Sequence, residues 1–366
     1  MYVHERKEWP DFKWDDEQLL QTLAEVRHHQ GRLLGKMEGL GFKQKEEASL
    51  QTLTEDVIKS SAIENENLPV DQVRSSIARR LGLNIAGMVP SERGVEGVVE
   101  MMMDATQHFE KPLISQRLFG WHNALFPTGK SGMYAITVGS WRSSKNDPMQ
   151  VVSGPMGKEQ IHFVAPDAVR IEAEMDRFLH WFNHFQDIDS LLKAGIAHLW
   201  FVTVHPFEDG NGRIARAIAD MQISRSDSSR QRFYSMSSQI RIERKEYYSL
   251  LEKTQGGDLD ITPWLSWFLQ CLNRAISHSE ERLAEVLMRA KFWEKNSGVS
   301  FNPRQLLMLT KLLDDFEGKL TTSKWAKMAK CSQDTSLRDI QDLVDKKILE
   351  KEPGGGRSTS YQLVLS

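Results

Sequence analysis

The sequence has little cysteine and no long hydrophobic run. Its only two cysteines, Cys271 and Cys331, lie far apart, so they indicate neither a disulfide framework nor a zinc site. No window approaches the roughly 18 consecutive apolar residues that a membrane-spanning helix needs, and the N-terminal residues lack the apolar core of a signal peptide. We therefore expect a cytoplasmic protein with no membrane partner.

The sequence also lacks an excess of charge of one sign. Its 47 Lys and Arg residues oppose 50 Asp and Glu residues, which leaves a net charge of −3. Such a balance gives no general attraction to nucleic acid or to anionic membranes. A length of 366 residues with 40% hydrophobic residues is ordinary for a globular protein of two or three domains.

One stretch carries a cluster of chemically useful side chains. Residues 203–216 read T-V-H-P-F-E-D-G-N-G-R-I-A-R. His205 has an ordinary pKa near neutrality, so it can accept a proton from an attacking hydroxyl group. The carboxylate of Asp209 is a hard oxygen ligand that suits Mg²⁺.

The second half of this stretch has the features of a phosphate site. The small residues of the G-N-G turn let the backbone approach a ligand closely, and we expect Asn211 to cap a helix whose first N–H groups face an anion. Arg213 and Arg216 follow in the first turns of that helix, where their guanidinium groups can bind phosphate oxygens. Each feature alone is more often structural, but together they indicate a nucleotide-phosphate site beside a general base.

The segment H-P-F-E-D-G-N-G-R-I-A-R resembles the Fic family signature, H-x-F-x-(D/E)-G-N-G-R-x-x-R, at every fixed position. The resemblance implies a mainly α-helical Fic core with a short β-hairpin flap. It also implies transfer of AMP from Mg·ATP to a hydroxyl side chain of a target protein or of the protein itself. In this family His205 would be the general base, Phe207 would anchor the loop and Asp209 would hold Mg²⁺. The nucleotide-binding positions would be Gly210, Asn211, Gly212, Arg213 and Arg216.

A second motif precedes this core. The segment S-S-A-I-E-N at residues 60–65 resembles the Fic inhibitory motif, (S/T)-x-x-x-E-(G/N), with Ser60, Glu64 and Asn65 at its fixed positions. Glu64 follows an apolar helical stripe, so we expect its carboxylate to need a cationic partner. We expect a bidentate pair with Arg216 that blocks productive ATP binding; the alternative is a helix end with an exposed glutamate. Glu66 does not fit the motif spacing, and we expect its substitution to have little effect.

Two further regions have a role only by the same resemblance. Two short strands around a glycine-containing turn are either a surface hairpin or the flap that binds a target segment by strand addition. The flap residues would be Val151, Val152, Ser153, Gly154, Ile161, His162 and Phe163. Tyr247 and Tyr248 lie in a segment similar to one that borders the nucleotide base, although core packing explains them equally well.

The pattern of helices and loops predicts four regions. Residues 1–68 form an N-terminal helical region with the inhibitory helix, 69–276 the Fic catalytic core, 277–300 a connecting helix, and 301–366 a small domain that resembles a winged helix-turn-helix with a turn at residues 353–357. The expected third helix of this domain carries several aspartates, which oppose DNA phosphates. DNA binding therefore remains open beside a role in protein contacts, and a homodimer is expected by analogy alone.

We expect a protein adenylyltransferase that Glu64 inhibits. One alternative is the reverse reaction, removal of AMP, in which the glutamate positions a water molecule. The other is a transcriptional regulator whose Fic domain senses nucleotide.

Overall fold

The computed structural model describes residues 1–85, 87–143, 148–154, 158, 160–313, 316, 318–352 and 359–364. The turn expected at residues 353–357 lies outside this range. The chain forms two compact units, Met1–Glu280 and Glu281–Ser366. None of the helices in the described ranges is both long and apolar enough to cross a membrane.

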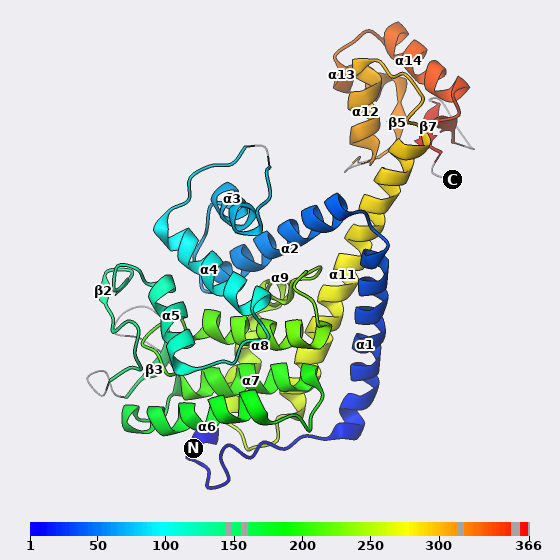
Figure 1. The fold of residues 1–366 in the computed structure, drawn as a ribbon. Coiled ribbons are helices and arrows are strands. Elements are labelled where there is room, and N and C mark those ends of the chain that lie inside the picture. The colour runs from blue at the N-terminus through cyan, green and yellow to red at the C-terminus, as the bar shows by residue number, and fades with distance from the viewer. Residues whose placement is uncertain are drawn as a thin grey trace. The chain divides into compact units, whose positions relative to one another are not determined.

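The first unit is mainly helical, as the sequence predicts (Figure 1). Its helices are α1 (Asp16–Glu38), α2 (Phe42–Ile63), α3 (Val70–Leu81), α4 (Arg93–Gln107), α5 (Ser115–Leu125), α6 (Ile171–His184), α7 (Ser190–Val204), α8 (Asn211–Asp227), α9 (Met236–Ile242), α10 (Arg244–Gln255) and the first part of α11 (Thr262–Lys295). Its strands form two antiparallel pairs, β1 (Lys130–Ser131) with β2 (Tyr134–Ala135) and β3 (Gln150–Ser153) with β4 (Gln160–Val164).

Helices α7 and α8 form the centre of this unit. Every residue of α7 after Ser190 is buried, because the helix is apolar on nearly all sides. Figure 1 shows α8 beside α7 and α6 on the other side of α7. A short loop at residues 205–210 joins α7 to α8, so the signature segment lies at one end of a buried helical hairpin.

One of the two central helices starts one residue away from the sequence-based expectation. Asp189 caps α7, since its carboxylate accepts a hydrogen bond from the Leu191 amide. Gly210, not Asn211, precedes α8, and its φ of +82° is a left-handed conformation that favours glycine. Asn211 is thereby the first residue of α8, and its side chain does not cap the helix.

Helix α2 packs its apolar stripe onto the core. Leu50, Leu53 and Val57 are each at most 1% exposed, as the helical spacing predicts. The helix ends at Ile63, whose carbonyl oxygen accepts a hydrogen bond of 2.6 Å from the Arg244 guanidinium. This fixed end places Glu64 directly after α2, at the signature loop.

A buried ionic cluster also joins α2 to the core. The Arg232 guanidinium lies 2.7 Å from a carboxylate oxygen of Asp220 on α8 and 3.6 Å from one of Asp56 on α2. All three residues are at most 2% exposed, and the Ser235 hydroxyl donates a 2.5 Å hydrogen bond to Asp56. Burial and the neighbouring Asp220 carboxylate raise the pKa of Asp56 to about 7.

The second unit has its own small core. Helix α11 runs without a break from Thr262 to Lys295, and so crosses the expected boundary between the core (69–276) and the connecting helix (277–300). The remaining elements are α12 (Pro303–Leu313), β5 (Leu320–Thr321), α13 (Thr322–Ala329), α14 (Gln333–Asp345), β6 (Leu349–Lys351) and β7 (Ser360–Leu363). The three strands form an antiparallel sheet in the order β5-β7-β6, and Trp325 is completely buried among the helices.

Candidate active site

His205 lies at the junction between α7 and the signature loop. Its φ of +51° is a left-handed conformation, which ends α7 and turns the chain toward the loop. The ring Nδ1 lies 3.3 Å from the Val202 carbonyl oxygen, so Nδ1 carries the proton and Nε2 keeps its lone pair. Burial, reinforced by the nearby Arg142, lowers the pKa of His205 to about 4. The ring is therefore neutral at pH 7 and can accept a proton.

Hydrogen bonds within the loop hold its shape without any ligand. The Asn211 side chain accepts a hydrogen bond from the Phe207 amide at 3.0 Å and donates one to the Phe207 carbonyl at 2.8 Å. Phe207 itself is fully buried, and its ring stacks on that of His122 with 4.1 Å between the centroids. The buried Arg142 donates to the His205 carbonyl at 2.9 Å. The loop is thus fixed from both sides.

The start of α8 is a candidate anion cradle. The first N–H groups of a helix have no partner within the helix and favour negative charge. Gly212 has no side chain here, and a Cβ at this position would lie 2.3 Å from the Glu64 Oε1 atom. The Glu64 carboxylate therefore lies beside the α8 backbone, at a helix start of the kind that favours an anion.

Arg216 connects this cradle to α2. Its guanidinium is 2% exposed, and it donates to the Ser60 hydroxyl at 3.0 Å and to the Ser60 carbonyl at 2.9 Å. Its Nη1 atom lies 2.9 Å from Glu64 Oε1, while the second carboxylate oxygen accepts a 3.0 Å hydrogen bond from the Tyr248 hydroxyl. The expected contact between Glu64 and Arg216 is present, but it uses one oxygen and is not bidentate.

Arg213 has a partner that the motif spacing did not indicate. Its Nη1 atom lies 2.5 Å from Glu66 Oε2, and its guanidinium lies over the Phe126 ring, 5.1 Å from the centroid. Arg213 is 6% exposed, whereas the Glu66 side chain is 42% exposed. One short segment after α2 thus supplies a carboxylate to each of the two signature arginines.

Asp209 offers a carboxylate at the edge of the cradle. One oxygen accepts a 2.6 Å hydrogen bond from the Gly210 amide and the other accepts one from the Ser131 hydroxyl. The described residues contain no group of three or more His, Cys, Asp and Glu side chains that could hold a metal ion. A single carboxylate fits Mg²⁺, since this ion is commonly held by one or two carboxylates together with substrate phosphates.

Many of these groups line one cavity of about 760 Å³, but Ser60, Arg213 and Arg216 are not among its lining residues. Its lining includes Glu64, Asn65, His205, Asp209, Gly210, Asn211, Gly212, Tyr247, Tyr248 and the hairpin residues Val151, Val152, Ser153, His162 and Phe163. A volume of this size is typical of a small-molecule site. The structure therefore brings most of the sequence-indicated residues together around one space.

The sequence-indicated tyrosines and hairpin residues differ in how deeply they are buried, and Gly154 and Ile161 are not among the residues that line the cavity. Tyr247 is 1% exposed and its hydroxyl lies 3.1 Å from the His198 Nε2 atom, whereas Tyr248 is 36% exposed. Phe163 is 1% exposed and contacts Tyr2, with 5.1 Å between the ring centroids. Phe163 thus anchors the hairpin, while Ile161 is exposed on it. Gly154 follows β3 with a φ of +103°.

Sequence reasoning missed three residues of the site. Ser131 and Arg142 come from the irregular segment before the hairpin, where no periodicity marks a side chain as buried. No local pattern distinguishes either residue from an ordinary position in a solvated loop. Glu66 was visible in the sequence but fell outside the motif pattern.

Comparisons with known proteins agree with this geometry. Residues 112–223 match the model of the Fic/DOC family, and residues 2–83 match a domain of unknown function, DUF4172. The protein adenylyltransferase Fic of Drosophila virilis is 27% identical over 135 residues, which is 36% of this chain and 26% of the relative. The corresponding protein of Drosophila mojavensis is also 27% identical over 135 residues, 36% of this chain and 25% of the relative. The matched segment thus spans about a quarter of these relatives.

A solved structure shares the fold. A Fic family protein from Desulfovibrio desulfuricans G20 superimposes with a TM-score of 0.54 at 19% identity, over 95% of this chain and 96% of that chain.

Proposed function

The chain contains a Fic/DOC-family domain, and on that premise we propose that it is a protein adenylyltransferase inhibited by its own α2 segment. It would transfer AMP from ATP to a hydroxyl side chain of a target protein or of itself. The observation that carries this proposal is the position of His205. A neutral imidazole whose Nε2 atom has no hydrogen-bond partner among the described residues lines the same cavity as the candidate anion cradle at a helix N-terminus.

In the proposed reaction the α8 N-terminus, Arg213 and Arg216 bind the phosphates of ATP. The target hydroxyl donates its proton to His205 Nε2 as its oxygen attacks the α-phosphorus. The bond between the α-phosphorus and the bridging oxygen then breaks, and pyrophosphate leaves. A Mg²⁺ ion held by Asp209 and the phosphates would neutralise charge on the leaving group.

Glu64 opposes this reaction in two ways. Its carboxylate occupies space at Gly212 and an N–H group of Arg216 that a phosphate would need. It also places a negative charge beside any phosphate that enters, in a partly closed cavity where such repulsion is weakly screened. We propose that ATP binds in a productive pose only when Glu64 has moved away.

The reverse reaction has one observation in its favour. Glu64 and His205 line the same cavity, so a carboxylate and a base are available to orient a water molecule toward an AMP-modified side chain. Incubating AMP-modified protein with wild type and with Glu64→Gln tests this activity, because loss of AMP that depends on Glu64 is expected only for a de-AMPylase.

For the second unit we propose a role in protein contacts. The acidic residues of α14 form internal pairs, such as Asp339 with Arg304 at 2.7 Å and Asp342 with Lys346 at 2.6 Å, and offer no positive surface to phosphates. Fluorescence anisotropy with duplex DNA at about 50 and about 200 mM salt is expected to show no salt-dependent binding. Specific binding at the higher salt would favour the nucleotide-sensing regulator.

The central experiment measures transfer of labelled AMP. Wild type, Glu64→Gly and Glu64→Gly with His205→Ala are incubated with α-labelled ATP and Mg²⁺, with and without cell lysate. The proposal expects label on protein with Glu64→Gly and none with the double variant. A folded Glu64→Gly variant that binds ATP and labels nothing would count against it.

A further inference from the structure

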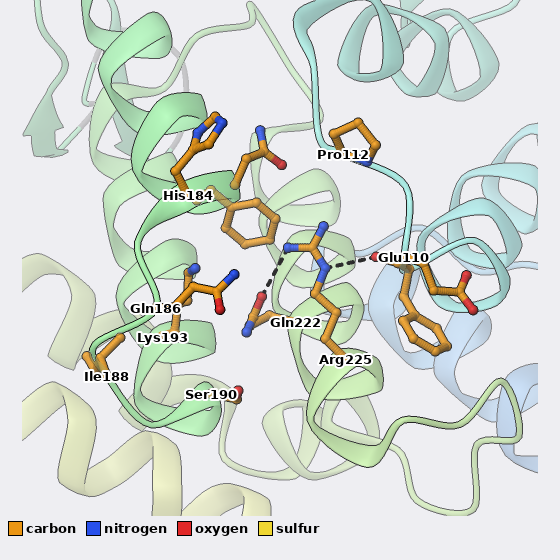
Figure 2. Close-up of a pocket in the computed structure, with 12 residues that line it drawn as sticks. Glu110, Pro112, His184, Gln186, Ile188, Ser190, Lys193, Gln222 and Arg225 are labelled. Carbon is orange, nitrogen blue, oxygen red and sulfur yellow. Dashed lines mark hydrogen bonds between the residues drawn. The ribbon is translucent and has the colours of Figure 1, made fainter.

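A second cavity of about 540 Å³ lies at the opposite end of the α7–α8 hairpin from His205 (Figure 2). Lys193 in the first turn of α7 and Gln222 and Arg225 near the end of α8 contribute to it. Figure 2 shows Glu110 and Pro112 on the other side, from the segment between α4 and α5. The reaction proposed above uses none of these residues.

Two buried or half-buried cations meet at one aromatic ring in this cavity. The Lys193 ammonium lies 5.8 Å and the Arg225 guanidinium carbon 4.8 Å from the centroid of the Phe182 ring. Lys193 is only 5% exposed. Its one hydrogen bond within the described residues goes to the Phe185 carbonyl, which leaves two of the three ammonium N–H groups for another acceptor.

Neither cation has a carboxylate partner in the described part of the chain. Arg225 donates to the carbonyls of Phe109 at 2.8 Å and Lys111 at 3.1 Å, and to the Gln222 side chain at 3.3 Å. The lining carboxylate of Glu110 pairs with Arg230 at 3.3 Å. Burial, with repulsion from Arg225, lowers the pKa of Lys193 to about 8, so the ammonium still predominates at pH 7. Positive charge in this cavity is thus balanced only by neutral acceptors.

A buried amide adds a third donor. Gln222 is 4% exposed, and its side-chain oxygen accepts the hydrogen bond from Arg225. Because the oxygen of this amide faces Arg225, its nitrogen points away from Arg225. The nitrogen has no hydrogen-bond acceptor among the described residues. An ammonium, a guanidinium and an amide therefore line one cavity without a matching anion, which is the donor set of an oxyanion site.

We propose that this cavity binds a small organic phosphate. Three donors suit the several oxygens of a phosphate group better than the two of a carboxylate. The rings of Phe109 and Phe182 provide apolar surface for the organic part, and the cavity volume falls in the range of small-molecule sites. The ligand is distinct from the nucleotide bound at His205, because the two sites lie at opposite ends of α7 and α8.

The test titrates the full chain with glycerol phosphate and measures the melting temperature at constant ionic strength. Arg216→Gln is used as the background, since it weakens phosphate binding in the first cavity. We expect stabilisation by glycerol phosphate but not by acetate, and a loss of affinity of at least about tenfold with Lys193→Met. The matched control is Lys13→Met, at an exposed position outside the cavity.

A second variant guards against misfolding of Lys193→Met. Gln222→Glu places a carboxylate between the cations, so it should raise the melting temperature without ligand and abolish the response to glycerol phosphate. The proposal would be overturned if glycerol phosphate raised the melting temperature equally in the Arg216→Gln background with and without Lys193→Met. It would also be overturned if glycerol phosphate did not change the melting temperature at all. A response to acetate as large as that to glycerol phosphate would also overturn the assignment to a phosphate.

A second inference rests on the proposed function and on the contact between Glu66 and Arg213. Glu66 follows Glu64 by two residues, and its amide donates to the Ser61 carbonyl at 3.0 Å, which folds the segment back onto the end of α2. The side chain then reaches Arg213 at 2.5 Å. We infer that Glu66 is a second inhibitory contact, which occupies one signature arginine while Glu64 occupies the other.

The readout is ATP affinity as well as transfer. Glu66→Gln keeps the size of the side chain but removes its charge, and should tighten ATP binding by roughly two- to fivefold, the range expected for a partly exposed ion pair. Adding Glu66→Gln to Glu64→Gly should tighten ATP binding by the same factor. The control is Glu47→Gln, which breaks an ion pair of α2 with Arg74 on α3.

The role of Glu66 and the transferase activity can fail separately. Unchanged ATP affinity in Glu66→Gln, with transfer by Glu64→Gly intact, would refute the role of Glu66 and leave the enzyme assignment standing. Tighter ATP binding without transfer by any variant would support the contact and refute the transferase.

Discussion

The Oε1 atom of Glu64 lies 2.9 Å from Arg216 Nη1 and would lie 2.3 Å from a side chain placed on Gly212. A carboxylate is thus held at the N-terminus of α8, in contact with a buried arginine. Glu64 therefore contacts both features of the proposed phosphate site, the helix end and the guanidinium.

Removing this carboxylate should activate the enzyme. Glu64→Gly frees Arg216 and the space at Gly212, so we expect AMP transfer to rise by at least about tenfold, a change of only about 1.4 kcal/mol in the barrier. Glu64→Gln separates charge from volume, because it keeps the shape of the side chain. If both variants transfer AMP at the wild-type rate while binding ATP, Glu64 is not inhibitory.

Loss of the base should remove activity but not the fold. His205→Ala in the Glu64→Gly background should lower kcat by roughly 10²- to 10⁴-fold, the usual contribution of general base catalysis. ATP affinity, measured directly, should change little. A variant with near-normal transfer at neutral pH would show that another group accepts the proton.

The pH profile gives an independent test of His205. Its pKa is lowered to about 4, mainly by burial, and the proposed reaction uses the neutral ring. The acidic limb of kcat/KM for Glu64→Gly should therefore lie well below the ordinary histidine pKa of about 6.5. A limb at or above that value would mean that the ring is more solvated in the working enzyme.

The carboxylate of Asp209 should determine the metal requirement. Asp209→Asn keeps an oxygen for the Gly210 amide but removes the charge, so transfer should slow and need a higher Mg²⁺ concentration. The measurement is the Mg²⁺ dependence of the initial rate. An unchanged dependence would place the ion elsewhere. Ser131→Ala, which removes only the neighbouring donor, is the matched control.

The buried cluster at Asp56 should make stability depend on pH. Its pKa is raised to about 7, whereas an unfolded aspartate titrates near 3.9, so the native state binds more protons between these values. The contribution of Asp56 to the free energy of unfolding must therefore fall as pH rises from about 4 to about 7. Asp56→Asn should remove this decrease.

Urea unfolding at about pH 5 and about pH 8 measures the effect, with the exposed Asp71→Asn as control. Identical pH slopes for wild type and Asp56→Asn would contradict the raised pKa. Arg232→Ala should behave differently, since it leaves buried carboxylates unpaired and should cost about 3–5 kcal/mol.

The sequence predicted those parts of the fold in which one helix face decides the structure. The apolar stripe of α2 and the all-round apolar character of α7 led directly to their burial. Single-residue positions at helix starts were less certain, because Asn211 can cap a helix or brace a loop with the same side chain, and here it braces Phe207. Local patterns cannot distinguish such roles.

Contacts between distant segments could not be predicted in the same way. Arg142 reaches the His205 carbonyl and Ser131 reaches Asp209 from segments without regular periodicity. The motif identified Glu64 but gave no reason to consider Glu66, whose position depends on how the chain turns after α2. These contacts arise from tertiary packing.

The position of Glu64 in the proposed phosphate cradle has a thermodynamic consequence. If ATP and the carboxylate exclude each other, ATP must weaken the attachment of the α2 end by the same factor by which that attachment weakens ATP binding. Any molecule that captured the released segment would increase nucleotide affinity without touching the cavity. In an intact chain, hydrogen exchange of the amides at residues 60–66 would then serve as a reporter of nucleotide occupancy.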